Sequence, residues 1–406
     1  MEEARGQIYR ELGITPVINA FEAITIYGGS LMPEEVLDAM RDASQSFISI
    51  PELNRKVGAR IAALTRNEAA FVTAGCAAAI ALSLAACMTG LDARKVAHLP
   101  CAARLPCAPA PSRTEDIKDE VIVHRCQRNP YDRAALLTGA RFVEFGYPAT
   151  QARTDQLEEV VSDRSAAILY FAGGIFEQFA LPLKEVVRIG RKYKVPVVVD
   201  AAAQLPPPEN LWRYTETGAD LALFSGGKGI RGPQNSGLIV GKRELIQAVE
   251  INSSPFHTFG RPMKTSKETI AGLLKALELF LNADHTAEYN RMEGQVRSFL
   301  ASLLGTPGIE TDFLATGRHG QLYPRGLVRL TEGSGFCRDE FMTLLEKGDP
   351  PVLVGPMDGD ARAFTVNPYS LKPGQEQIVA GRIQGLLGTR GTAPGRPVNE
   401  NKREVE

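Results

Sequence analysis

The sequence predicts an α/β fold in which a mostly parallel, seven-stranded sheet is covered by helices on both faces. Three observations support this prediction. Short apolar runs recur between residues 69 and 241, amphipathic helical patterns lie between several of them, and Gly and Pro fall mostly at strand ends. Strands that are apolar on both faces are typical of parallel sheets buried between helices. The 406 residues, 44% hydrophobic and 23% charged, are those of an ordinary globular protein.

The order of the patterns divides the chain. The predicted strands are residues 69–75, 120–124, 141–146, 166–172, 195–202, 221–226 and 236–241. Helices are expected at 33–44, 77–88, 132–138, 155–162 and 183–193, followed by a long helical region at 242–290. A smaller C-terminal α+β domain then includes a strand at 326–330 and a helix at 337–348. We therefore predict an N-terminal segment (1–60), a large domain (61–260), a linker helix with a small domain (261–388) and a disordered tail (389–406).

Composition excludes several classes of function. The net charge of −1 gives no global basic excess for nucleic acid. The uncharged stretch 69–91 reads as a strand and a buried helix because Thr73 and Gly75 interrupt it, so no membrane span is expected. The charged N-terminus is not a secretory signal, which predicts a cytoplasmic protein with reduced thiols. The six cysteines are scattered, and no metal site is predicted. The Pro-, Ala- and Cys-rich segment 100–113 suggests no function.

An acid and a lysine carry the strongest chemical signal. Asp200 ends the apolar run VVVD, and Lys228 follows the next predicted strand in the small-residue loop SGGKG. Open α/β sheets bind ligands at the carboxyl ends of their strands. A pyridoxal 5′-phosphate (PLP) enzyme needs these two groups, a carboxylate for the pyridine nitrogen and an amine for the Schiff base. The alternatives are a helix N-cap for Asp200 and a solvated loop position for Lys228.

A predicted phosphate cradle supports the cofactor assignment. In TAGCAAA (73–79) a strand ends in a small-residue turn and a helix begins at once. Backbone N–H groups of Ala74, Gly75 and Cys76 are placed to bind a phosphate there, and Ser225 offers a hydroxyl. Such turns also occur without a ligand. Cys76 reads as a small packing residue that lends its N–H.

Polar residues also follow the strand at 120–124. The stretch HRCQRNPYD (124–132) contains Gln127, predicted to contact the cofactor, and Arg128, predicted to contact the substrate. We expect at least one side chain of this stretch to face the open side of the cofactor ring, because ligands of such sheets bind at this edge. The alternative is a solvated turn before a helix that begins near Pro130.

Four segments of the sequence resemble those of a known family. The run SGGKGIRGPQNSGLIVGKREL (225–245) is similar to the PLP-lysine segment of the selenocysteine synthase superfamily, and PVINA (16–20) resembles its opening motif. GDPPVLVG (348–355) and FTVNPYSL (364–371) resemble its C-terminal domain. The resemblance covers about residues 8–388. It implies the PLP-dependent transferase fold (fold type I, the aspartate aminotransferase type) and a homodimer or a multiple of dimers.

Details of the resemblance favour a branch that includes D-glucosaminate-6-phosphate ammonia-lyase. VDAAAQLPP, in which Ala202 packs on the ring and Gln204 contacts the cofactor, resembles that branch, and so does FGRPMK (259–264). There Arg261 and Lys264 are predicted to bind an anionic substrate group or the cofactor phosphate. Solvated charges before a helix are the alternative. From the opening motif, Asn19 is predicted to bind substrate.

Two departures from the family limit what carries over. Selenocysteine synthases that act on seryl-tRNA have a sizeable N-terminal tRNA-binding domain, whereas about 15 residues precede Pro16 here, so we expect no tRNA partner. Relatives also have an arginine in a D-P-R-T-L-like segment, and Tyr369 stands in its place. Tyr369 is kept as a candidate substrate contact.

The sequence therefore predicts a PLP-dependent lyase acting on a small-molecule amino acid or amino sugar acid. Lys228 abstracts the Cα proton and a β-leaving group departs, as in an ammonia-lyase. The alternatives are another PLP reaction at Cα, such as racemisation, aldol cleavage or transamination, and selenium or sulfur transfer to a seryl substrate. A cofactor-binding protein that has lost catalysis is the alternative outside enzymes.

Overall fold

The computed structural model of the protein describes residues 6–100 and 117–390, in two compact units. Unit 1 consists of residues up to 22, 286–317 and from 323 onward; unit 2 consists of 23–285 and 318–322. This division differs from the predicted boundaries at 60 and 260. Helices α2, α3 and α11 supply buried residues to the core of unit 2, so both flanks of the predicted large domain belong to that unit. The segment 100–113 lies outside the described residues except for its first residue, as does the predicted tail beyond residue 390.

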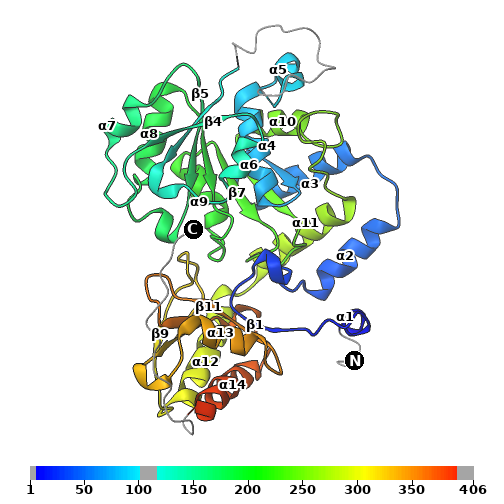
Figure 1. The fold of residues 1–406 in the computed structure, drawn as a ribbon. Coiled ribbons are helices and arrows are strands. Elements are labelled where there is room, and N and C mark those ends of the chain that lie inside the picture. The colour runs from blue at the N-terminus through cyan, green and yellow to red at the C-terminus, as the bar shows by residue number, and fades with distance from the viewer. Residues whose placement is uncertain (1–5, 101–116, 391–406) are drawn as a thin grey trace. The chain divides into compact units, whose positions relative to one another are not determined.

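Unit 2 is built on a seven-stranded sheet with the order β2-β8-β7-β6-β5-β3-β4 (Figure 1). Only β8 runs antiparallel to its neighbours, so the mostly parallel sheet is confirmed. All seven predicted strands are present, as β2 (Ala69–Thr73), β3 (Glu120–His124), β4 (Arg141–Phe145), β5 (Ser165–Phe171), β6 (Val197–Asp200), β7 (Leu221–Ser225) and β8 (Gly237–Gly241).

Helices cover both faces of this sheet and bury two apolar layers. The first layer packs against α2 (Glu34–Ser44), α3 (Ile50–Leu64), α7 (Thr154–Glu159), α8 (Leu183–Tyr193), α9 (Asn210–Thr217) and α11 (Lys267–Asn282). The second packs against α4 (Cys76–Thr89), α6 (Asp132–Leu136) and α10 (Arg243–Asn252). Shorter elements are α5 (Ala93–Ala97), η1 (Thr25–Tyr27), η3 (Arg125–Gln127) and η4 (Gly174–Phe176).

Helix α4 is the most thoroughly buried helix of the second layer. Ile80, Leu82 and Leu84 are at most 1% exposed, and the alanines between them let the helix lie close against the sheet. Eleven of its fourteen residues are buried. The uncharged stretch is thus a strand and a core helix, as predicted. None of the helices in the described part of the chain is long and apolar enough to cross a membrane.

Unit 1 contains a five-stranded sheet with the order β1-β11-β12-β10-β9. Its strands are β1 (Ile18–Ala20), β9 (Ile309–Leu314), β10 (Arg325–Leu330), β11 (Val352–Pro356) and β12 (Ala363–Val366). Its helices are α1 (Gln7–Glu11), α12 (His285–Leu303, whose first residue belongs to unit 2), α13 (Arg338–Glu346) and α14 (Gln375–Arg390), with short turns η5 (Glu332–Ser334) and η6 (Pro368–Ser370). Strand β1 pairs in parallel with β11, so the opening motif is part of the smaller α+β unit.

Candidate active site

The predicted acid lies at the carboxyl end of β6. Strands β2, β6 and β7 run in the same direction, so Thr73, Asp200 and Ser225 end at one edge of the sheet. Asp200 is 7% exposed. Its Oδ1 accepts a hydrogen bond from the Ala202 N–H at 2.9 Å and lies 3.7 Å from the Cys76 Sγ, which donates to it. The β6 strand therefore delivers a buried carboxylate to the edge where ligands of this fold class bind.

The carboxylate of Asp200 is poorly solvated because it is buried. Burial raises the pKa of the Asp200 carboxyl, while the Ala202 N–H and the charge of Lys228 act to lower that pKa. A bound cation that donates a hydrogen bond to this carboxylate would compensate for the missing water. A protonated pyridine nitrogen is such a cation, and the Asp200 carboxylate is a fitting acceptor for it.

Lys228 lies in a loop whose backbone is tightly constrained. Its side chain is half-buried, and its charge acts on both Asp200 and Cys76. A Cβ on Gly227 would lie 2.5 Å from the Gln234 Cα, and one on Gly229 would lie 2.2 Å from the Leu205 carbonyl oxygen. The glycines on both sides of the lysine are therefore required by close contacts with the protein backbone.

A segment that sequence reasoning did not assign to the site holds this loop from the N-terminal side. The Ser30 N–H donates to the Gly227 carbonyl at 3.0 Å, and the Gln234 amide donates to the Thr25 carbonyl at 3.0 Å. A Cβ on Gly29, whose φ is +76°, would lie 2.8 Å from the Gly227 oxygen. The glycine pair in Tyr27–Ser30 was the available sequence signal, and its meaning depends on a contact about 200 residues away.

The predicted phosphate cradle is an open helix N-terminus. Gly75 is the N-cap of α4 with φ +91°, and no side chain caps this end. A Cβ on Gly75 would meet nothing within 4 Å, so space lies beside the unpaired N–H groups of the first turn. Gly237 of β8 allows the turn to approach, because a Cβ there would lie 2.5 Å from the Gly75 carbonyl carbon. A phosphate dianion fits this combination of space, N–H groups and helix dipole.

The predicted contacts at the end of β3 make different bonds. The Gln127 amide is fully buried; it donates to the carbonyls of Phe171 (2.9 Å) and Phe176 (3.2 Å) and accepts from the Phe171 N–H at 3.2 Å. Arg128 pairs with Asp132 at 2.6 Å and with Glu144. The cofactor role of Gln127 and the substrate role of Arg128 stay predictions. Both side chains already have hydrogen-bond or ion-pair partners within the protein.

The remaining cofactor candidates after β6 and β7 lie beside Asp200. The Ala202 N–H fixes one oxygen of the acid, and the Ser225 N–H contacts the Ala202 carbonyl at 3.4 Å. Gln204 is 7% exposed and donates to the Ala172 carbonyl at 3.1 Å. The structure thus brings Cys76, Asp200, Ala202, Ser225 and Lys228 together within unit 2.

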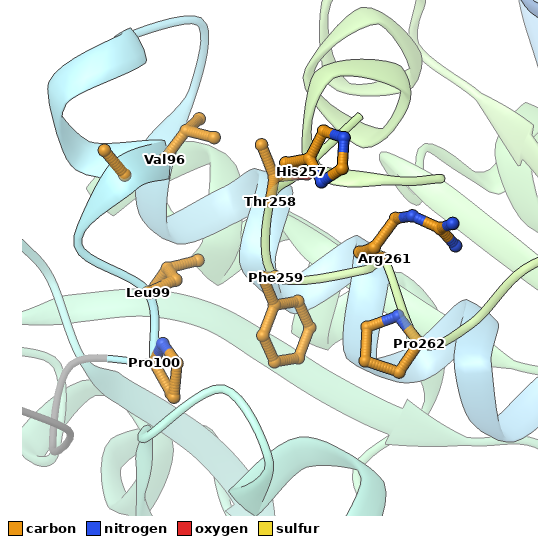
Figure 2. A pocket seen from close by; sticks show the side chains of 9 residues that line it. Val96, Leu99, Pro100, His257, Thr258, Phe259, Arg261 and Pro262 are labelled. Carbon is orange, nitrogen blue, oxygen red and sulfur yellow. The ribbon is translucent and has the colours of Figure 1, made fainter. Parts of the chain in front are cut away.

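Arg261 and Lys264 are exposed residues of the loop between α10 and α11. Neither side chain makes a hydrogen bond or an ion pair within residues 6–100 and 117–390. Arg261 borders a cavity of about 570 Å³ (Figure 2). Its lining residues are Val96, Ala97, Leu99, Pro100, His257, Thr258, Phe259, Arg261 and Pro262. Both cations are available to an anion, so their predicted role stays open.

The last two substrate candidates belong to unit 1. Asn19 uses its side chain locally, donating to the Glu22 carbonyl at 2.9 Å and accepting from the Phe21 N–H at 3.0 Å. Tyr369 is half-buried and its ring centroid lies 5.5 Å from that of Tyr323. Both assignments remain predictions. Within the described part of the chain, no cluster of three His, Cys, Asp or Glu residues is arranged to hold a metal ion.

Comparison with known proteins finds relatives that span nearly the whole chain. The family model of L-seryl-tRNA selenium transferase matches residues 138–292. The chain is 28% identical to a 5′-C-glycyluridine monooxygenase-decarboxylase from a Streptomyces species, over 95% of this chain and 93% of that protein. It is 26% identical to the D-glucosaminate-6-phosphate ammonia lyase of Salmonella typhimurium, over 93% and 97%.

Solved structures give the same picture. The structure of a D-glucosaminate-6-phosphate ammonia-lyase matches with a TM-score of 0.79 at 26% identity, covering 95% of this chain and 99% of that one. A serine palmitoyltransferase of Sphingomonas wittichii matches with a TM-score of 0.55 at 13% identity, over 90% and 86%, and shows the fold alone.

Fold, site and comparisons together define a PLP-dependent enzyme of fold type I. Within that class the chain is similar to the selenocysteine synthase superfamily, in the branch that contains the ammonia-lyase, as the lysine-loop motif predicted.

Proposed function

We propose that the protein is a PLP-dependent lyase that removes ammonia from an amino acid or an amino sugar acid. One observation carries the proposal most directly. Asp200 and Lys228 interact at the carboxyl edge of the large sheet, beside the open N-terminus of α4. The full-length similarity to an ammonia-lyase in sequence and in fold supports this reaction type over the others that PLP makes possible.

The residues of this chain have distinct roles in the proposal. When bound, PLP supplies an electron sink for the carbanion formed at Cα of the substrate. Asp200 keeps the pyridine nitrogen protonated, and the N-terminal turn of α4 holds the phosphate. The Lys228 amine carries the cofactor before substrate arrives and then takes the Cα proton onto Nζ. A β-substituent departs with a proton, as water when it is a hydroxyl group, and hydrolysis of the remaining imine consumes one water to give a keto acid and ammonia.

The substrate is expected to be anionic. Arg261 and Lys264 are exposed, and neither side chain makes a hydrogen bond or an ion pair among the described residues, so we assign both to an acidic group of the substrate. Asn19, Arg128 and Tyr369 are the further predicted substrate contacts. A phosphorylated amino sugar acid, the type of compound named for the similar ammonia-lyase, is the first class to test.

A screen for released ammonia tests the reaction. Purified protein with added PLP is incubated with amino acids, amino sugar acids and their 6-phosphates, and ammonia and keto acid are measured together. We expect equal amounts of the two products from one class of substrate, and none from Lys228→Ala. Product formation that persists in Lys228→Ala would contradict the assigned base.

A second candidate reaction follows from the similarity to the monooxygenase-decarboxylase, which at 28% identity spans nearly the whole chain. Its name indicates consumption of oxygen and loss of a carboxyl group. The same screen separates the two candidates when oxygen uptake and CO₂ are recorded. Release of ammonia without oxygen uptake favours the lyase, and oxygen uptake with CO₂ release favours the alternative.

We also propose that the enzyme is a homodimer or a multiple of dimers, as the resemblance implies, and that it has no tRNA partner. Light scattering after gel filtration measures the first, with an even multiple of the 44.0 kDa chain mass as the expected result. A gel-shift titration with tRNA at physiological salt tests the second. A shift that survives such salt would contradict it.

A further inference from the structure

Cys76 touches both ends of the proposed cofactor site. It is the first residue of α4, so its N–H is one of the unpaired groups of the phosphate cradle. Its Sγ lies 3.7 Å from Asp200 Oδ1, a separation within the range for a thiol donor to a carboxylate. Residues 76 and 200 are 124 positions apart, so this contact exists only because β2 and β6 end at the same edge.

The thiol hydrogen bond selects one oxygen of the acid. Oδ1 of Asp200 receives both donors, the Ala202 N–H at 2.9 Å and the Cys76 thiol at 3.7 Å. Neither of these two donors reaches Oδ2. A carboxylate whose Oδ1 is held from two directions cannot rotate freely, so Oδ2 keeps a fixed direction for a cationic N–H partner.

The state of the thiol agrees with a donor role. Burial and the nearby carboxylate of Asp200 raise the pKa of Cys76 well above its ordinary value, and the charge of Lys228 lowers it only in part. The thiol therefore keeps its proton at neutral pH. A protonated thiol donates to a carboxylate and is a poor nucleophile, which argues against covalent chemistry at this cysteine.

We propose that Cys76 is a positioning residue that aims the Asp200 carboxylate at the pyridine nitrogen. It links the phosphate cradle, through its backbone N–H, to the acid at the opposite end of the cofactor, through its thiol. This proposal rests on the proposed function, since it requires PLP in the site. It goes beyond the packing role that the sequence suggested for Cys76, because it makes the effect of the thiol depend on Asp200.

A double-mutant cycle isolates that dependence. The dissociation constant for PLP is measured by absorbance titration for the wild type and for Cys76→Ala, Asp200→Ala and the double variant. Cys76→Val, whose side chain fills the space of the cysteine but has no donor, replaces Cys76→Ala if that variant is poorly folded. Cys87→Ala is the matched control, since Cys87 lies in the same helix and its thiol is likewise shifted to a higher pKa by burial, without a bond to Asp200.

We expect Cys76→Ala to weaken PLP binding by about 3- to 10-fold, the effect of one modest hydrogen bond. In the Asp200→Ala background the same change should alter the dissociation constant by less than about 2-fold. Cys87→Ala should leave the dissociation constant for PLP unchanged, both in the wild type and in the Asp200→Ala background. A loss of equal size with and without Asp200 would mean that Cys76 only packs, and would overturn the proposal.

A second readout does not depend on affinity. The pH at which the visible band of the bound cofactor changes should move in Cys76→Ala and stay in place in Cys87→Ala, because only the first alters the hydrogen bonding of Asp200. An unmoved midpoint in both would also count against the proposal. A wild-type protein that binds no PLP at all would instead refute the proposed function, so the two failures are distinguishable.

Discussion

The ends of β6 and β3 form an instructive comparison within unit 2. Both strands are buried, run parallel in one sheet and are followed by polar residues, so both were predicted to feed the active site. At the end of β6, Asp200 is buried and interacts with Lys228. At the end of β3, Gln127 and Arg128 bond to neighbouring protein groups instead.

The difference shows that a run of polar residues at a strand end does not reveal whether their side chains remain available to a ligand. A polar side chain serves a ligand when its bonding capacity is left open, and backbone groups of other elements can use that capacity. Gln127 hydrogen-bonds to β5 and η4 and so holds the end of β3 in place. Asp200 retains a carboxylate whose charge is poorly compensated by the protein alone.

Loss of the lysine should have the largest effect. Lys228→Ala removes the proposed base, and the turnover rate should fall by at least about 10²-fold. Lys184→Ala, at an exposed position of α8, is the control and should keep wild-type turnover. Steady-state rates of ammonia release measure both. Turnover of Lys228→Ala within a few-fold of the wild type would remove the lysine from the mechanism.

Loss of the Gln127 amide should affect stability first. Gln127→Leu removes the amide donor from the carbonyls of Phe171 and Phe176, of which the second keeps only the Cys126 thiol, and the free energy of unfolding should fall by about 2–3 kcal/mol. Denaturant unfolding of the cofactor-free protein gives this value. If the variant is as stable as the wild type but binds PLP more weakly, Gln127 contacts the cofactor, and the ends of β3 and β6 do not differ in the way described.

Replacing Asp200 with a neutral residue should increase the free energy of unfolding, whereas Gln127→Leu lowers it. Burial raises the Asp200 pKa, so the folded protein binds a proton more tightly than the unfolded chain does. The stability from this proton is complete below the unfolded pKa of about 3.9 and is lost as pH rises through the raised folded pKa. Asp200→Asn should therefore stabilise the cofactor-free protein by about 1–2 kcal/mol at neutral pH. Near pH 3.5 that gain should disappear; a gain independent of pH would contradict the argument.

The cradle should show the smallest effect. Gly75→Ala places a side chain at φ +91° and in the open space beside the first-turn N–H groups, and should weaken the affinity for PLP by roughly 5-fold, equivalent to about 1 kcal/mol. Pyridoxal without phosphate should lose less affinity. Gly294→Ala in α12, where a Cβ meets nothing within 4 Å and φ is not positive, is the control. Equal losses for PLP and pyridoxal would argue against a phosphate at this turn.

Most of the large sheet was predictable, because its strands are apolar runs separated by helical patterns. The same reasoning missed β1, β9 and α3. Strand β1 has three residues and pairs with a strand more than 300 positions away, so no local pattern defines it. None of the six residues of β9 is buried, and three consecutive residues, Glu310 to Asp312, are exposed, so the strand has no alternating pattern of buried and exposed positions.

The site was predictable where motif and local conformation coincide. The glycines around Lys228 and the small-residue turn before α4 reveal local backbone conformation in the sequence, and Asp200 is marked by its place at the end of the apolar run of β6. The thiol of Cys76 and the segment Thr25–Leu31 act through contacts with distant residues. Their roles depend on which strand ends are neighbours in the sheet, and one sequence does not specify that order.

The most direct test of the central assignment is reduction of the PLP-treated protein with borohydride, followed by a visible spectrum and peptide mass analysis. The assignment predicts a yellow protein whose absorbance band is lost on reduction, with the cofactor mass fixed on the peptide that contains Lys228. A colourless protein, or a cofactor mass fixed on another lysine, would contradict it.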